Sequence, residues 1–407
     1  MRAFATCDLL APAGATAGLY PQPSPPCQQR FRRLAVPPVR APGNQVPSPP
    51  MHRKRTHALH AALGFAAGGA LLWLALRNAD PGRLWALLTG VDLRFFAPVF
   101  LLVMALLALF FWLKAVRWSW LLRPLAPLRT ADVFPPLMIG FMCNNILPAH
   151  LGEFVRMYVL AAQRGLRNTA VLSTIVLERL LDFLAVVGVF AVTLQFVPLS
   201  PELAGLRTVG YAVGAACAAL FACFVIFVWR TAWALRAADR TLAAALRLGV
   251  GILIFLPAER RRRLRVRLHA KLFGLLEAGV PGLFSLRNLR MFGAMVAITL
   301  LLWSLNGLML YLAVISFAPA QPVPLLAALF LFSVCALGIT LPSAPGYIGT
   351  TQFCFVIALQ PFGVDREIAL AGSFYALFLG IVPVTLAGLY YAARLGLKLR
   401  TIKEEAA

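Results

Sequence analysis

Residues 291–364 read MFGAMVAITLLLWSLNGLMLYLAVISFAPAQPVPLLAALFLFSVCALGITLPSAPGYIGTTQFCFVIALQPFGV, and they contain no Asp, Glu, Lys or Arg. A bilayer-spanning helix needs about 20 consecutive apolar residues, so this stretch is long enough for more than one such helix. Prolines and glycines interrupt its second half. We therefore predict one full span over 291–317, followed by a broken pair of apolar segments at 324–340 and 347–360.

The whole chain of 407 residues has a similar character, since 60% of its residues are hydrophobic and 13% are charged. Soluble domains average roughly 45–50% apolar and about 25% charged residues. The net charge of +23 indicates basic cytoplasmic loops that contact anionic lipid headgroups, and no motif favours nucleic acid as a partner. The seven cysteines lack CxxC spacing, which excludes a zinc ribbon, and we expect no metal and no cofactor.

Four further runs are free of formal charge and long enough to span a bilayer: 58–76, 95–113, 208–229 and 368–392. The run 170–196 is equally long but contains three charged residues, and a second Pro/Gly-broken segment lies at 133–162. The sequence thus predicts an all-α polytopic membrane protein with about six to eight transmembrane helices. Two topologies place every loop on its predicted side of the membrane. One has six full spans with two re-entrant hairpins, and the other has eight spans, with 324–360 crossing twice.

Basic residues predict the orientation, because Lys and Arg concentrate in cytoplasmic loops. The cluster Arg53-Lys54-Arg55 places the N-terminus in the cytoplasm, and the loop 230–290, with 13 Lys and Arg, lies on the same side. We assign four more basic residues to a cytoplasmic loop after the second span: Lys114, Arg117, Arg123 and Arg129. Leucines at helical spacing within 258–277 predict a basic amphipathic helix on the membrane surface.

The two ends of the chain differ from its apolar middle. Residues 1–50 hold 11 of the 29 prolines and no apolar periodicity, so we predict a disordered tail, with Met51 as an alternative start. A transmembrane domain should occupy 51–400, with a cytoplasmic tail at 401–407. We expect a multi-pass protein of the inner membrane with both termini in the cytoplasm.

The two broken segments share a short pattern. The first contains Leu147-Pro148-Ala149-His150-Leu151-Gly152 and the second contains Leu341-Pro342-Ser343-Ala344-Pro345-Gly346. From the predicted loop positions, the first segment enters the membrane from the cytoplasm and the second enters it from the outside. Paired, interrupted segments of opposite orientation are typical of transporters built as inverted repeats, with a site near the midplane.

The sequence resembles a known family at these positions. Asn144–Arg156 looks like the first signature of a flippase-like membrane family that includes the transmembrane region of lysylphosphatidylglycerol synthase. Glu178–Asp182 resembles its second signature and Leu341–Thr350 its third, in the family's order. The resemblance covers roughly residues 55–400 and implies a protein that handles lipids or lipid-linked intermediates.

Two departures from the family stand out. His150 occupies a position where the family usually has an Arg, which puts a fixed positive charge there in doubt. The soluble aminoacyltransferase domain of the full synthase does not follow the membrane region, so we expect no synthase activity from this chain.

Charged residues within the predicted spans are the main candidates for a site, because a charge at the bilayer centre costs at least about 2.5–3.5 kcal/mol. Glu178 and Asp182 lie on one helix face with Arg179 beside them, and we expect Glu153 and Arg156 as their partners. This group could bind a lipid headgroup or a proton, with His150 adding a titratable charge. It could equally be a self-satisfied ion network that locks two helices together.

The second broken segment supplies polar groups to an uncharged region. We predict a second half-site from Pro342, Gly346, Tyr347, Thr350 and Gln352, whose groups could instead satisfy backbone atoms freed by the prolines. In the first segment we assign structural roles at the helix break to four residues: Asn144, Asn145, Pro148 and Gly152.

The resulting functional hypothesis is a flippase that moves a phospholipid, or a polyprenyl- or terpenoid-linked lipid, between leaflets. The alternatives are a membrane-embedded aminoacyl- or glycosyltransferase and an accessory subunit of a separate lipid-modifying synthase. Against an enzyme, no loop carries a donor-binding motif. Anionic phospholipids are expected partners in each case.

Overall fold

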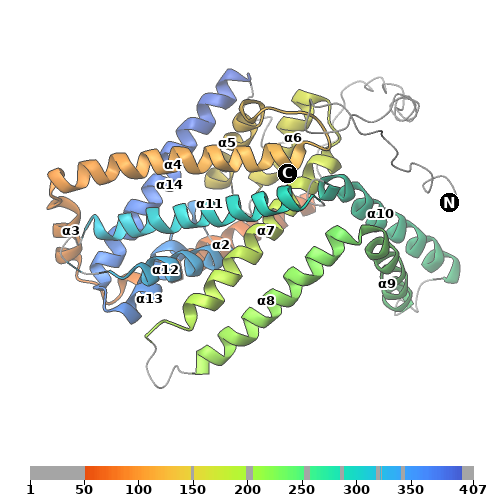
Figure 1. Cartoon of the computed structure of the whole chain (residues 1–407). Coiled ribbons are helices and arrows are strands. Elements are labelled where there is room, and N and C mark those ends of the chain that lie inside the picture. The colour runs from red at the N-terminus through yellow and green to blue at the C-terminus, as the bar shows by residue number, and fades with distance from the viewer. Residues whose placement is uncertain are drawn as a thin grey trace. The chain divides into compact units, whose positions relative to one another are not determined.

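The computed structural model confirms an all-α membrane fold (Figure 1). It describes residues 51–147, 151–198, 205–251, 257–284, 288–317, 321, 323–340 and 344–396. The chain divides into two units, Met1–Lys54 and Arg55–Ala407, and the second contains nearly all described residues. The predicted tails 1–50 and 401–407, together with Pro148, His150 and Pro342, lie outside the described residues.

Every regular element among the described residues is helical. The elements are α2 (Met51–Leu76), α3 (Pro81–Thr89), α4 (Leu93–Leu122), α5 (Thr130–Ile146), α6 (Gly152–Arg164), α7 (Asn168–Leu194), α8 (Gly205–Trp229), α9 (Thr231–Gly251), α10 (Ala258–Phe284), α11 (Leu289–Ile315), α12 (Leu325–Gly338), η3 (Pro345–Tyr347), α13 (Thr350–Leu359), η4 (Gln360–Phe362) and α14 (Arg366–Arg394).

Four helices in the described part of the chain are long and apolar enough to cross a membrane: α4, the segment Arg207–Ile226 of α8, α11 and α14. Each coincides with a run that the sequence predicts as a span. Helix α7, with 27 residues, is as long as α11, but charged residues interrupt its apolar surface near the middle.

The order of elements repeats. A long helix, a broken pair and a second long helix occur as α4, α5–α6 and α7, and again as α11, α12–α13 and α14. Helices α4 and α11 pack side by side and run in opposite directions (Figure 1). This arrangement agrees with an inverted repeat.

The lengths of the broken helices decide between the two predicted topologies. Helix α12 has 14 residues and α13 has 10. At 1.5 Å per residue they are about 21 Å and 15 Å long, which is shorter than the hydrocarbon core of about 30 Å. Neither can cross alone, and the two pack against each other. The lengths favour a re-entrant hairpin.

The break after α5 follows from its local sequence. Leu147 adopts extended backbone, as expected for a residue that precedes a proline. Across the break, the Asn144 side-chain oxygen accepts a hydrogen bond from the Gly152 N–H at 2.8 Å. Asn144 thus caps the first turn of α6, a role that the sequence predicts for it. Because Gly140 and Gly152 have no side chains, the backbones of α5 and α6 come into direct contact there.

The second break uses left-handed backbone. Gly346 and Gly349 have φ of 70° and 87°, and Tyr347, which lies between them, has φ of 61°. A non-glycine residue in this region costs roughly 1–3 kcal/mol, so its surroundings must hold it. The Gln352 side-chain oxygen accepts from the Gly349 N–H at 2.7 Å and fixes the start of α13. On the other side, the backbone of Gly68 in α2 packs directly against Gly349.

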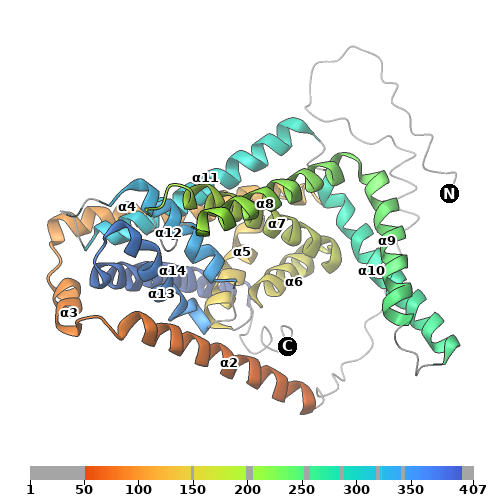
Figure 2. The ribbon, with the colours of Figure 1, turned by 90° about the horizontal axis from the view of Figure 1, so that it is seen from below.

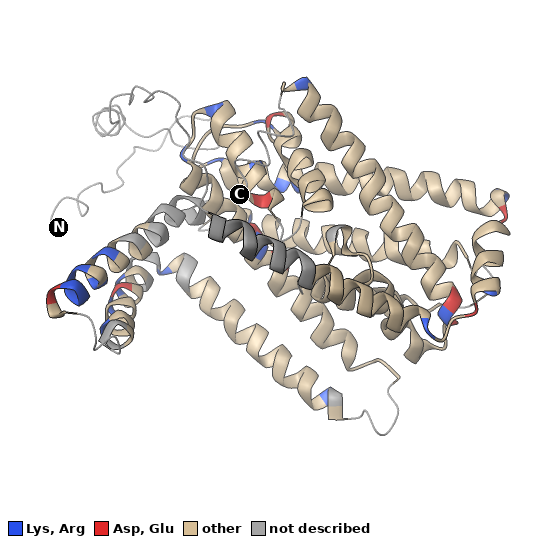
Figure 3. Ribbon diagram, turned by 180° about the vertical axis from the view of Figure 1, so that it is seen from behind, with Lys and Arg blue, Asp and Glu red and all other residues tan. Residues whose placement is uncertain are grey.

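The basic loop 230–290 contains two helices, α9 and α10, which lie side by side (Figure 2). Helix α10 includes the predicted amphipathic segment 258–277, where Leu264 and Leu268 are half-buried and Arg262 and Arg267 are exposed. The Nε2 atom of His269 in α10 lies 3.2 Å from a carboxylate oxygen of Asp239 in α9. Figure 3 shows Lys and Arg gathered along this pair, while most of the remaining described helices carry few charges.

We expect Gly152→Ala to destabilise the first hairpin, because a Cβ there would lie 1.9 Å from the Gly140 carbonyl oxygen. Overpacking of this kind costs about 1–3 kcal/mol, which should lower the melting temperature of the detergent-solubilised protein. Gly69→Ala in α2 is the matched control, since nothing lies within 4 Å of a Cβ there. Equal melting temperatures for the two variants would contradict the tight helix contact.

Candidate functional site

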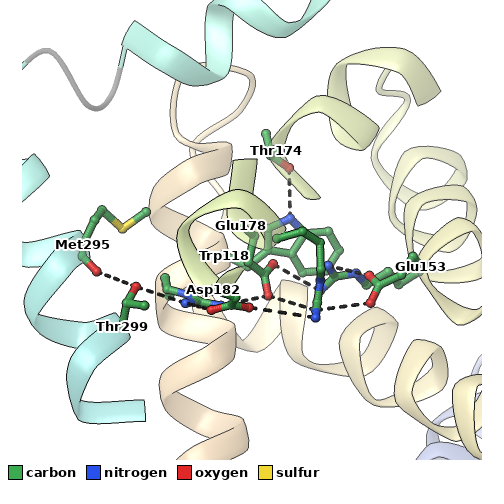
Figure 4. A network of polar contacts seen from close by, with 10 residues as sticks. Trp118, Glu153, Thr174, Glu178, Asp182, Met295 and Thr299 are labelled. Atoms are coloured by element: carbon green, nitrogen blue, oxygen red, sulfur yellow. Dashed lines mark hydrogen bonds and ion pairs between the residues drawn. The ribbon is translucent and has the colours of Figure 1, made fainter. Parts of the chain in front are cut away.

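A cluster of charged side chains connects α4, α6 and α7 (Figure 4). At its centre, the fully buried Arg117 donates to both oxygens of Asp182, at 2.6 and 3.0 Å. It also donates to Glu178 at 3.1 Å and to the hydroxyl of Thr299 in α11 at 3.1 Å. A two-pronged contact of this kind uses the planar shape of the guanidinium group and is among the strongest protein ion pairs.

Arg156 extends the cluster from α7 to α6. Its guanidinium lies 3.2 Å from Glu178 and 2.7 Å from Glu153. One face of the guanidinium packs over the ring of Trp118, 4.8 Å from the centroid. The Trp118 indole N–H donates to Thr174 at 3.0 Å, which orients the ring. The predicted pairing of Arg156 with Glu178 is therefore present.

Arg179 and Glu153 form the accessible edge of the cluster. They are 3.2 Å apart, and their side chains are 41% and 17% exposed, whereas those of Arg117 and Glu178 are both 0% exposed. A ligand can therefore reach Arg179 without breaking the central contacts. The Nε atoms of Arg117, Arg156 and Arg179 are buried and donate no hydrogen bond to any described residue.

Lys114 lies beside this cluster and gives it an excess of positive charge. Its ammonium group lies over three rings, those of Phe110, Phe141 and Trp303, at 5.1 to 5.4 Å. Such cation–π contacts stabilise a desolvated cation by about 2 kcal/mol. Among the described residues the cluster then holds four cations, Lys114, Arg117, Arg156 and Arg179, and three carboxylates, Glu153, Glu178 and Asp182.

One residue of the predicted second half-site reaches the cluster. Tyr347 lies near enough to Arg179 and Glu153 to interact with them electrostatically. The η3 segment that carries it also packs against α5, so the two broken segments meet beside the accessible edge of the cluster.

The other described members of that half-site belong to the turn before α13 and to the first residues of α13. Gln352 caps α13, and the hydroxyl of the buried Thr350 has no hydrogen-bond partner among the described residues. Gly346 supplies the left-handed turn that leads to Tyr347. Asn145, for which we predict a role at the first break, instead donates to Thr385 and to the Gly380 carbonyl of α14, both at 3.2 Å.

The assignment of Lys114 and Arg117 to a cytoplasmic loop is wrong. Helix α4 continues to Leu122, and both side chains are buried inside the helix bundle. The signal was present in the sequence, because Phe110, Lys114, Arg117 and Leu121 recur at a helical spacing of three or four residues. The apolar and aromatic residues that follow Arg117 extend the span beyond residue 113.

Comparison with known proteins places this architecture in a family. The model of the lysylphosphatidylglycerol synthase transmembrane region matches residues 61–388. The chain belongs to this family. No curated protein and no solved structure matches the chain. All five charged residues that the sequence predicts as headgroup ligands contact one another in pairs within the matched region: Glu153, Arg156, Glu178, Arg179 and Asp182.

We expect Arg117→Leu to lower the unfolding temperature of the bundle, with a loss of about 3–5 kcal/mol, because it removes the cation that donates to both oxygens of the buried Asp182. The double variant Arg117→Leu/Asp182→Leu should be more stable than Arg117→Leu, since Glu178 keeps its contact with Arg156. Thermal unfolding in detergent measures both effects.

Arg83→Leu provides the control for this experiment. Arg83 pairs with Asp365 at a position where the two side chains are 54% and 45% exposed. An exposed pair contributes at most about 1 kcal/mol, so this variant should melt close to the parent. Strictly additive losses in the double variant would show that Arg117 and Asp182 do not stabilise each other.

Proposed function

We propose that this protein moves a lipid with an anionic headgroup between the two leaflets of the membrane. The observation that carries the proposal is a charged cluster with an excess of one cation, placed where two broken segments meet inside a membrane-spanning bundle. A buried excess of positive charge attracts an anion, and a phosphate group fits arginine side chains in particular.

The position of the cluster suits transbilayer movement. Glu178 and Asp182 lie near the middle of α7, a helix of 27 residues. If α7 spans the membrane, the cluster therefore lies far from either surface. A headgroup that crosses the bilayer needs polar contacts at this depth, because the hydrocarbon core offers none.

The cluster divides into two parts in this proposal. Arg117, Glu178 and Asp182 hold α4 and α7 together, since all three side chains are buried and Arg117 contacts both carboxylates. Arg179 and Glu153 exchange their mutual contact for contacts with the headgroup, because they are the accessible members. The sequence leaves open an ion network and a ligand site. In this proposal the buried residues of the cluster form the ion network, and its accessible residues form the ligand site.

Tyr347 connects this site to the second broken segment. Its strained backbone and its position next to Arg179 suit a residue that moves when the headgroup arrives. In this proposal the second hairpin closes the site towards the outside, and the first hairpin closes it towards the cytoplasm. The basic α9–α10 pair then lies against the anionic cytoplasmic leaflet of the inner membrane, with both termini on that side.

Lipid movement in reconstituted vesicles tests the proposal. With fluorescent phosphatidylglycerol as the probe, Arg179→Gln should slow transbilayer movement about tenfold or more, because a charge-assisted hydrogen bond contributes about 1.5–3 kcal/mol. Its melting temperature should change little, since the central contacts of Arg117 remain.

Arg164→Gln is the matched control for this assay. Arg164 has a similarly exposed side chain, at 39%, and also pairs with a carboxylate, Asp132, at 2.7 Å, but it lies outside the cluster. We expect this variant to move lipid at the parental rate. If Arg179→Gln and Arg156→Ala both move the probe as fast as the parent while folding normally, the headgroup site is not at this cluster.

A further inference from the structure

A cavity of about 890 Å³ lies between α7, α8 and α11, away from the accessible edge of the charged cluster. None of the described residues that line it is charged, and most are aliphatic, aromatic or glycine. Helix α8 lies at the edge of the described bundle, and its membrane-spanning segment is mostly exposed (Figures 1 and 2). The cavity is thus part of the region that contacts lipid.

Small residues create this cavity. Helix α8 approaches α7 closely at Gly214, where an added Cβ would lie 3.2 Å from Ala191, and Cys217 donates to the Leu184 carbonyl at 3.4 Å. At the other side, the ring of Phe221 packs 6.2 Å from that of Phe292 in α11. Between these contacts, Gly188 leaves open space, because nothing lies within 4 Å of a Cβ at that position.

The cavity has the length of a lipid chain in one leaflet. Its lining on α7 extends from Leu181 to Thr193. At 1.5 Å per residue this distance is about 18 Å, slightly more than half of the hydrocarbon core of about 30 Å. The inner end lies beside Thr299, which accepts a hydrogen bond from Arg117, so the cavity ends at the level of the cluster.

The outer end of the cavity is polar. Gln195 and Tyr211 line it, and the side-chain oxygen of Gln195 is buried without a hydrogen-bond partner among the described residues. Arg207 lies at the same end of α8, exposed, and donates to the Val197 carbonyl at 3.4 Å. An amide, a hydroxyl and a cation above an apolar channel complement an amphiphile with a negatively charged headgroup.

We propose that this cavity binds one hydrocarbon chain of an anionic lipid from the leaflet in which α7 ends. The chain extends from Gln195 inward to Thr299, and the headgroup lies at Arg207 and Tyr211. A lipid chain fits this cavity, because the length of the cavity matches the thickness of one leaflet and its polar groups lie at one end. This site is separate from the proposed headgroup site at Arg179 and does not depend on it.

Photo-crosslinking in vesicles tests this site. The probe is phosphatidylglycerol with a diazirine in one acyl chain, present as a minor component of phosphatidylcholine vesicles. Cross-linked peptides should come from α7, α8 and α11. Gly188→Leu should reduce these adducts about tenfold, because its side chain fills the cavity and overpacking by this much displaces a bound chain.

Gly69→Leu is the matched control, because Gly69 also lies in an apolar helix with nothing within 4 Å of a Cβ, but outside the cavity. Its adducts should equal those of the parent. Ser304→Leu fills the same cavity from α11 and replaces Gly188→Leu if that variant fails to fold. Arg207→Gln should reduce labelling by the phosphatidylglycerol probe and leave labelling by a phosphatidylcholine probe unchanged.

Two results would overturn the inference. One is labelling spread evenly over the exposed faces of α2 and α4, which would indicate annular lipid only. The other is labelling that neither Gly188→Leu nor Ser304→Leu reduces. The test of lipid movement is independent of this one, because Arg179→Gln should slow lipid movement without changing these adducts.

Discussion

The contact of Arg117 with Asp182 and Glu178 is the interaction on which the rest of the bundle depends. All three side chains are buried among membrane-spanning helices, where an unpaired charge is costly. Their pairing therefore fixes the rotation of α4 and α7 about their own axes. Thr299 and Arg156 then connect α11 and α6 to the same centre.

The broken hairpins are possible because this centre and a few glycines hold them. Arg156 and Glu153 lie in the first turns of α6, so the start of that helix is bound to α7 by ion pairs. Gly140 and Gly152 then allow α5 to pack against it without intervening side chains. The second hairpin relies on backbone contact between Gly349 and Gly68 instead. Interrupted helices at membrane depth need such enclosure, because their free backbone groups cannot face lipid.

Much of the fold could be predicted from particular residues. The uncharged run 291–364 predicts α11 and the α12–α13 pair, and Pro148 with Gly152 predicts the first break. The ion pair between Arg156 and Glu178 was also predictable, since a buried carboxylate in α7 needs a cation and Arg156 lies in the adjoining segment. Lys114 and Arg117 were missed because a hydropathy pattern treats any basic residue as the end of a span. It cannot recognise a cation that is buried against carboxylates or aromatic rings.

The sequence by itself determined the class of the protein, the approximate positions of its spans, its two interruptions and the presence of charges inside the membrane. These properties depend on the length and composition of local segments, because the thickness of the bilayer sets how many apolar residues a spanning helix needs. Only the tertiary structure decided that Arg117 pairs with Asp182 and Glu178, that α12 and α13 are too short to cross, and that Tyr347 lies near Arg179. Those outcomes depend on the rotation and separation of helices distant in the chain, which side-chain packing, buried ion pairs and backbone contacts set together.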